Sequence, residues 1–162
     1  MKIITFLVAG LLMGTLFSCA SESSAEETPK VQVNLDSILI GTWENISLEV
    51  IVNSFNNTDS SFSILVPRGS WEEKLGIKPI KTTYDGNNTY QSEYRNPSDS
   101  LIRTTRGIWN IFGDTLMLIE PEATYEYKVR IRESMAEFQS ILDWDGDGKF
   151  DDSYKGTQIK ID

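Results

Sequence analysis

The residues with the clearest capacity for chemistry are the aspartates near the C-terminus, in the stretch ILDWDGDGKFDD at 141–152. Asp143, Asp145 and Asp147 alternate along the chain, so their carboxylates can turn towards one point. Two further aspartates follow in the same connection. Carboxylate oxygens in this number suit a hard cation such as Ca²⁺, and the sequence contains no histidine that would indicate zinc.

The spacing of these aspartates resembles the D-x-D-x-D-G core of an EF-hand calcium loop. Gly148 stands where that loop bends sharply, and Lys149 can offer its carbonyl oxygen. Position twelve is Tyr154 rather than the bidentate Glu of an EF-hand, and the flanks are predicted to be strands. We therefore expect a structural calcium site of low affinity, about 0.1–1 mM. The predicted ligands are Asp143, Asp145, Asp147, Lys149, Asp151 and Asp152.

A bare hairpin turn is the alternative interpretation of the same residues, because Asp-Gly pairs favour such turns for backbone reasons alone. Neighbouring carboxylates ~6 Å apart, however, repel by about 0.7 kcal/mol per pair even in water before salt screening. A turn needs one or two acids, whereas this connection holds five. Calcium is the favoured interpretation, and the bare turn stays open.

Strands must position these residues, since the hydrophobic period from Gly41 onward is two. Tyr125, Tyr127 and Val129 share one face of a strand whose other face is charged, and the even-numbered residues of 46–52 alternate likewise. Gly, Asn and Asp between the segments predict hairpin turns. Strands are predicted at 43–53, 60–66, 80–84, 89–94, 101–112, 115–119, 124–133, 135–142 and 154–161.

Eight or nine short strands joined by hairpins are best accommodated by a sheet that closes on itself. We therefore predict an all-β protein, with a closed or nearly closed antiparallel β-barrel of about eight to nine strands. A two-sheet sandwich is the alternative. Short helices are predicted at 35–39 and, after the second strand, at 70–76, where Ser70 and Glu73 form a capping box and Gly76 ends the helix.

The start of the first predicted strand, LIGTW at 39–43, resembles lipocalin-like domains, where a Gly-x-Trp follows a short helical turn and the indole plugs the closed end of the barrel. GIW at 107–109 with GDTL at 113–116 is similar to the middle hairpin of small lipocalin-like lipoproteins of Gram-negative bacteria. The resemblance extends over residues 39–161 and implies a lipocalin-like barrel.

The resemblance also implies two features of the barrel. An Arg or Lys of the last strand should lie over Trp43, with Lys155 and Lys160 as the candidates; Trp43 as an ordinary core residue is the alternative. Similar proteins bind small hydrophobic molecules in the barrel. The predicted ligand-pocket residues are Trp109, Tyr125, Tyr127 and Phe138. The same side chains, together with Phe62, could instead fill the lumen, so a hollow and a filled barrel both stay open.

The N-terminus, MKIITFLVAGLLMGTLFSC, predicts secretion, because a basic residue precedes an apolar run at 3–17. That run is shorter than the ~20 residues that a membrane-spanning helix needs. LFSC at 16–19 resembles the lipobox of bacterial lipoproteins, which implies that residues 1–18 are removed and that Cys19 is acylated. Ordinary signal cleavage after Ala20, which would remove the cysteine, is the alternative.

After Cys19 the chain reads ASESSAEETPK, without a large apolar residue, which predicts a flexible tether at 19–34 and a folded domain at 35–162. Ala20 beside the cysteine resembles the outer-membrane class of lipoproteins. We expect an envelope protein held on the outer membrane through acylated Cys19, facing the periplasm or the cell surface.

Composition excludes several function classes. The formal net charge of −9 repels phosphate backbones, which argues against nucleic acid as a partner. Without histidine there is no Ser-His-Asp or Cys-His catalysis. Glu120 and Glu122 flank Pro121 at a predicted turn and are expected to be solvated rather than to serve a glycosidase. We expect no enzymatic activity.

Three hypotheses remain, of which a carboxylate-based hydrolase is the disfavoured third and the other two are non-catalytic. The first is a non-catalytic binding protein for a small apolar ligand, with a structural calcium site in the last hairpin loop. The alternative is a calcium-stiffened module with a filled barrel that binds an envelope protein or glycan through its loops. Tyr90 and Tyr94, which stand beside Asn and Ser and are expected to be exposed, support this alternative.

Overall fold

The computed structural model describes residues 34–162, so the predicted signal peptide, Cys19 and nearly all of the tether lie outside the described residues. The strands of the described part are β1 (Gly41–Val52), β2 (Phe62–Val66), β3 (Lys81–Tyr84), β4 (Thr89–Arg95), β5 (Leu101–Phe112), β6 (Thr115–Ile119), β7 (Thr124–Arg132), β8 (Met135–Leu142) and β9 (Asp152–Lys160). Its helices are α1 (Leu35–Leu39), the short 3₁₀ turn η1 (Phe55–Asn57) and α2 (Trp71–Leu75). None of these described helices is long and apolar enough to cross a membrane.

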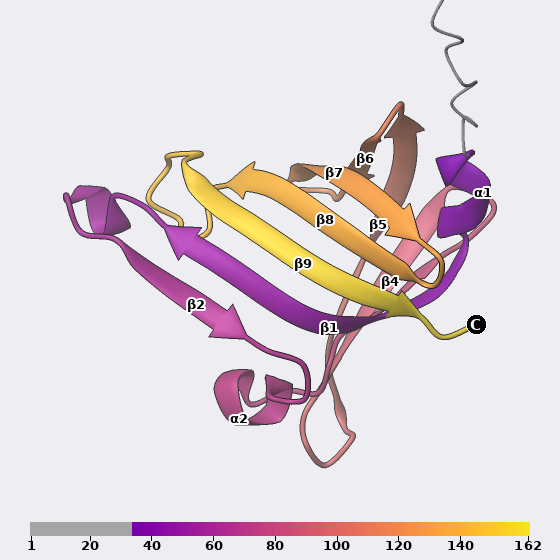
Figure 1. Ribbon diagram of the computed structural model, residues 1–162, viewed down its shortest axis with the longest axis horizontal. Coiled ribbons are helices and arrows are strands. Elements are labelled where there is room, and N and C mark those ends of the chain that lie inside the picture. Colours follow the sequence, from indigo (N-terminus) through magenta and orange to yellow (C-terminus); the bar gives the residue numbers. More distant parts are fainter. Residues whose placement is uncertain (1–33) are drawn as a thin grey trace, which may run out of the picture. The chain divides into compact units, whose positions relative to one another are not determined.

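Eight of the strands form a closed antiparallel barrel, as predicted (Figure 1). Strands β3 to β9 pair in sequence order, β1 pairs with β3, and the pairing of β1 with β9 closes the barrel. The ninth strand, β2, lies outside the barrel and pairs with the second half of β1. The predicted all-β class, the antiparallel closure and the short helix after the second strand are thus confirmed.

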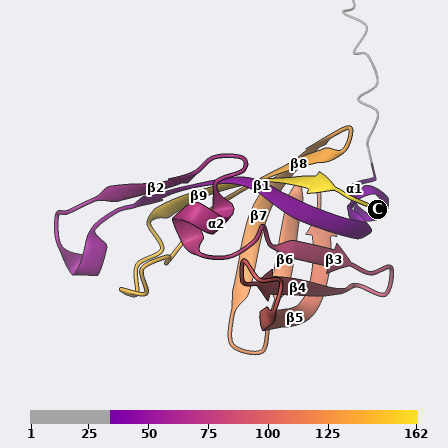
Figure 2. The same cartoon turned by 90° about the horizontal axis from the view of Figure 1, so that it is seen from below.

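The first and last strands run on beyond the barrel. The N-terminal half of β1 pairs with β3, and its C-terminal half pairs with β2 along the same edge. In Figure 2, β2 and the adjoining ends of β1 and β9 extend to one side of the strands that close the barrel. Strand β1 therefore belongs both to the barrel and to a projecting sheet.

A β-bulge at Ile46 divides these two roles of β1. Asn45 faces Gln158 of β9 while Ser47 already faces Thr157, so Ile46 is the extra residue. Before the bulge the odd-numbered residues of β1 are buried, and after it the even-numbered ones are. The predicted alternation was therefore wrong at Ile46. The strand changes phase there, so Ile46 is half-buried and does not share the buried face of the even-numbered residues that follow.

Two apolar clusters stabilise the fold. The first fills the barrel near α1 and contains Leu39, Trp43, Tyr84, Tyr90, Trp109, Leu116, Val129, Ala136 and Phe138. The second lies under the projecting sheet and contains Leu48, Val50, Val52, Val66 and Trp71. Trp71 belongs to α2, and its indole N–H donates to the carbonyl of Ile46 at 3.0 Å. Helix α2 thus covers the apolar face of the projecting sheet.

The ends of α2 differ in how well they were predicted. Gly76 ends the helix in the left-handed conformation with φ of 67°, as expected. Ser70, however, makes no capping hydrogen bond; its hydroxyl donates to the carbonyl of Pro67 at 2.8 Å. The predicted capping box was therefore wrong.

Trp43 lies fully buried at the α1 end of the barrel. Its indole N–H donates to the carbonyl of Leu39 at 2.8 Å. The ammonium of Lys160 lies 5.6 Å from the centre of the indole ring and donates to the carbonyls of Ile38 and Ile40. Of the two candidate lysines, Lys160 thus occupies the position that the lipocalin resemblance implied, and it joins β9 to α1 and β1.

We predict that Lys160→Met lowers the free energy of unfolding by about 2 kcal/mol, because two backbone carbonyls lose a charged donor and Trp43 loses its cation. Urea unfolding checks this. The matched control is Lys155→Met on the same strand, where the lysine only makes a surface ion pair with Glu137 and its loss should cost less than about 1 kcal/mol. Equal losses for the two variants would contradict the role given to Lys160.

Candidate functional site

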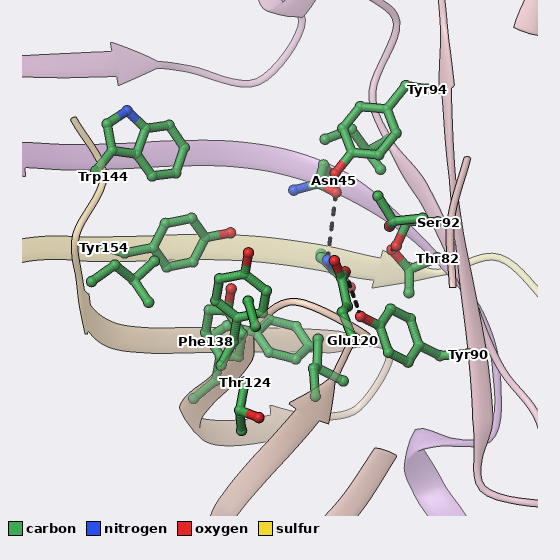
Figure 3. A pocket seen from close by; sticks show the side chains of 18 of the residues that line it. Asn45, Thr82, Tyr90, Ser92, Tyr94, Glu120, Thr124, Phe138, Trp144 and Tyr154 are labelled. Atoms are coloured by element: carbon green, nitrogen blue, oxygen red, sulfur yellow. Dashed lines mark hydrogen bonds between the residues drawn. The ribbon is translucent and has the colours of Figure 1, made fainter. Parts of the chain in front are cut away.

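The barrel contains a cavity of about 810 Å³ whose lining side chains come from strands all around it (Figure 3). All six tyrosines of the chain line this one cavity, namely Tyr84, Tyr90, Tyr94, Tyr125, Tyr127 and Tyr154. They lie on β3, β4, β7 and β9. The inward faces of these strands therefore give the cavity a largely aromatic wall.

Polar side chains interrupt this aromatic wall. Thr82 and Ser92 share a hydrogen bond of 2.8 Å and so satisfy each other. The Gln158 amide donates to Asn45 at 3.4 Å, which is long for such a bond. The carbonyl oxygen Oε1 of Gln158 is buried and has no partner among the described residues, although only 8% of the residue is exposed. Gln158 therefore leaves an unused acceptor on the cavity wall.

Glu120 also lines the cavity, where it accepts a hydrogen bond of 2.7 Å from the Tyr90 hydroxyl (Figure 3). The expectation that Glu120 is merely solvated was therefore wrong. The expectation of exposed Tyr90 and Tyr94 was wrong too, since Tyr90 is 3% exposed and Tyr94 lines the cavity. The turn at Pro121 brings this acid back over the cavity rather than away from it.

Five tyrosine hydroxyls of the cavity have a raised pKa and are neutral at physiological pH, namely those of Tyr84, Tyr90, Tyr94, Tyr127 and Tyr154. Burial raises the pKa of Tyr154 to about 12 and that of Tyr127 well above the ordinary value. Burial and then the hydrogen bond to Glu120 raise the pKa of Tyr90. These groups can therefore donate and accept hydrogen bonds, but they bring no charge to the cavity.

The structure brings together most of the predicted pocket residues. Tyr125, Tyr127 and Phe138 line the cavity. Trp109 lies instead in the apolar cluster near α1, where its ring centre is 6.0 Å from that of Tyr84. Phe62, which was considered as a filler of the lumen, lies on β2 outside the barrel and packs edge-on against Phe55.

The aspartate loop, residues 143–151 between β8 and β9, forms the second candidate site together with Asp152. Asp143, Asp145 and Asp152 bring one carboxylate oxygen each within 4.8 Å of one another, an arrangement that could hold a metal ion. One oxygen of Asp143 is buried without a partner among the described residues. The three residues are thus a candidate cation site.

The predicted ligands Asp147 and Asp151 do not belong to this cluster of three. Asp147 accepts hydrogen bonds from the backbone of Asn57 and of Lys149, at 3.0 and 2.9 Å. Asp151 accepts from the hydroxyl of Ser54 at 2.7 Å. Asp147 and Asp151 therefore hold the aspartate loop against the turn between β1 and β2.

Backbone N–H groups fold the aspartate loop around its carboxylates. Gly148 donates to Asp143 at 3.0 Å, and the backbone N–H of Asn56 donates to Asp145 at 3.1 Å. Asn56 and Asn57 both have positive φ, which aims their N–H groups at the loop. These donors offset part of the repulsion between the carboxylates. The sequence had indicated that a bound cation would offset it.

The cavity and the aspartate loop share a border. Asp143, Trp144 and Phe150 of the loop belong to the cavity lining. Trp144 stacks on Tyr154 with ring centres 6.0 Å apart. A cation bound in the loop would therefore stiffen one rim of the cavity.

No protein-family model matches the chain, and no curated protein matches it in sequence. Trp43 lies behind a short helix with Lys160 over its ring, which is the arrangement that the resemblance in the sequence implied. The function therefore has to be inferred from the geometry of the cavity and the loop.

Several residues of the cavity were not among those predicted from the sequence. Asn45 was not identified because the alternation predicted for 46–52 does not continue across the bulge at Ile46, and Gln158 of β9 faces Asn45 only once the barrel has closed. Thr82 and Ser92 gave a usable signal, since each stands two residues from a lining tyrosine in its own strand. Period-two reasoning applied to polar residues would have found those two.

Proposed function

We propose that this protein is a lipid-anchored envelope lipoprotein whose lipocalin-like barrel carries a small ligand without catalysing a reaction. The observation that carries the proposal is the cavity, because its volume of about 810 Å³ lies in the range of about 300–1,000 Å³ typical of ligand pockets. The unused acceptor of Gln158 supports it, since a buried polar atom without a partner destabilises a protein until a ligand or water satisfies it.

The lining suggests an amphipathic ligand. Phe138, Leu118 and the tyrosine rings offer contact area to an apolar group, which agrees with the small hydrophobic ligand expected from the lipocalin resemblance. Gln158 and Glu120 offer hydrogen-bond acceptors to a polar end. The proposed ligand therefore has one apolar part and one polar part.

We predict that Thr105→Trp abolishes ligand binding, because Thr105 lines the cavity and an indole there would occupy much of it. Binding is measured as the fluorescence of N-phenyl-1-naphthylamine, a neutral apolar probe, with the full chain in lipid nanodiscs. The affinity of Thr105→Trp should fall by at least about tenfold, as expected for overpacking a site. Thr104→Trp, one residue away on the opposite face of β5, is the control and should bind as the wild type does.

Failure of the wild-type protein to bind the probe would count against a ligand-carrying barrel. Native mass spectrometry of the full chain extracted from its own membrane provides a second readout, because a carried molecule adds a defined mass. Retained probe binding by Thr105→Trp would place the ligand outside the cavity.

Lipid anchoring through Cys19 is supported by the resemblance of LFSC to a lipobox and by the Ser- and Glu-rich segment that follows it. We predict that the wild-type chain sediments with membranes and carries the mass of acyl groups on Cys19. Cys19→Ser should lose that mass, because serine offers no thiol for acylation. The anchor would be contradicted if the wild type and Cys19→Ser sedimented with membranes to the same extent and the wild type carried no acyl mass.

A structural calcium ion in the aspartate loop is supported by the cluster of Asp143, Asp145 and Asp152 and by the D-x-D-x-D-G spacing. At ten times its dissociation constant such an ion stabilises the folded state by about 1.4 kcal/mol. We predict that millimolar calcium raises the melting temperature by about 3–5 °C over chelator in the wild type. Asp143→Asn should lose this difference.

The control for calcium is Asp59→Asn, which removes an exposed acid from the neighbouring turn and should keep the full calcium-dependent rise. Equal melting of the wild type with calcium and with chelator would leave the loop as a hydrogen-bonded turn. Ligand binding by the barrel would stand in that case, because the cavity does not depend on the ion.

A second candidate function is the binding of an envelope protein or glycan, favoured by exposed aromatics of the aspartate loop. Phe150 is 74% exposed and Trp144 41% exposed. Capture of a partner by the anchored chain would support this function if Thr105→Trp, with its cavity filled, captured the partner equally well. Loss of capture in Thr105→Trp would instead indicate that the partner binds at the cavity.

A further inference from the structure

The charges that line the cavity are mostly negative. Glu120 and Glu122 contribute carboxylates that lie outside the candidate cation site, and Arg103 contributes the one cationic side chain found among the described lining residues. The Arg103 guanidinium lies 5.3 Å from the ring centre of Tyr94, so this cation already faces an aromatic partner. The carboxylates therefore dominate the electrostatic potential of the cavity, and a carboxylate or phosphate ligand would be repelled.

The tyrosine rings favour a cation in the same space. The face of an aromatic ring is electron-rich and attracts an ammonium group within about 6 Å. Besides Tyr94, which faces Arg103, five tyrosines line the cavity, and their rings offer faces and edges to a ligand. The ring of Tyr127 lies 5.5 Å from that of Tyr154 and 6.2 Å from that of Phe138, so these three aromatic side chains are neighbours in the wall.

Two hydrogen-bond acceptors of the cavity can accept from a ligand, so the ligand should carry a hydrogen-bond donor. Gln158 is more than nine-tenths buried, lines the cavity and presents an oxygen that no described residue satisfies. Glu120 presents a carboxylate that, among the described residues, accepts a hydrogen bond from the Tyr90 hydroxyl alone. An ammonium group brings up to three N–H donors and no acceptor, and so matches this pair of acceptors.

We propose that the cavity binds a small organic cation, a protonated amine that carries an apolar or aromatic group, in preference to neutral or anionic molecules. This inference rests on the proposed ligand-carrying function and adds the chemical class of the ligand. The apolar part packs among the aromatic rings, and the ammonium group bonds to Glu120 and Gln158. The formal net charge of −9 attracts such a ligand towards the protein over longer distances.

The test uses three probes that share a phenylethyl group and differ in charge: 2-phenylethylamine, 2-phenylethanol and 3-phenylpropionate. Isothermal titration calorimetry measures their binding to the full chain in nanodiscs, with empty nanodiscs subtracted. The amine should bind at least about tenfold more tightly than the alcohol, as a charged hydrogen bond allows. The propionate should bind most weakly of the three.

Variants locate the charge effect. Glu120→Gln keeps the shape of the side chain and should reduce the affinity for the amine about tenfold while leaving that for the alcohol within about twofold. Gln158→Met, which removes the unused acceptor, should also weaken the amine. The matched control is Glu126→Gln on β7, an exposed acid outside the cavity lining, which should change neither affinity. Thermal melting verifies that each variant is folded.

The outcomes separate this inference from the function on which it rests. Equal binding of amine and alcohol, or preferred binding of the propionate, would overturn the preference for a cation and leave a ligand-carrying barrel in place. Equal effects of Glu120→Gln and Glu126→Gln would overturn the assigned role of Glu120. If none of the three probes binds and N-phenyl-1-naphthylamine does not bind either, both the inference and the proposed function fall.

Discussion

One extra residue in β1 is the constraint on which the rest of the structure depends. The bulge at Ile46 exchanges the inward and outward faces of the strand, so that Trp43 and Asn45 face the barrel while Val50 faces the apolar cluster under the projecting sheet. The same strand can thereby close the barrel against β9 and continue past it to pair with β2. In a regular strand, either Trp43 or Val50 would point into water.

A buried carboxylate links the projecting sheet to the cavity. Asp152 is 1% exposed, and its oxygens accept backbone N–H groups of Asn53 at 2.8 Å, Trp144 at 2.7 Å and Asp145 at 3.4 Å. These donors come from the turn after β1 and from the aspartate loop, so one side chain holds the two loops in register. The rim of the cavity is thus positioned by hydrogen bonds in the protein itself, and a cation would add to a frame that is already formed.

The strands were predictable because each carries its own signal, such as the alternation of Tyr125, Tyr127 and Val129, and because turn residues separate them. The cluster of Asp143 and Asp145 was predictable from spacing for the same reason. The buried position of Asp152 was not predictable, since it arises because β9 begins earlier than its apolar residues indicated and pairs this aspartate with Leu142.

The polar chemistry of the cavity was hidden because it depends on pairs of residues far apart in the chain. Tyr90 meets Glu120, and Asn45 meets Gln158, only after the barrel has closed. Nothing local distinguishes a glutamate beside a proline at a solvated turn from one that folds over a lumen. The bulge that turns Asn45 inward has no sequence mark of its own, and its position follows from the pairing of β1 with β9.

Gly107 illustrates how closely this chemistry is tied to the backbone. It stands opposite Tyr90 in the pairing of β4 with β5, and a β-carbon there would lie 2.2 Å from the carbonyl oxygen of Ile119 and 2.8 Å from the ring of Tyr90. The missing side chain lets the phenol lie flat across β5 and reach the acid on the far side. The selectivity of the lumen therefore depends partly on the missing β-carbon of Gly107, a residue outside the cavity lining.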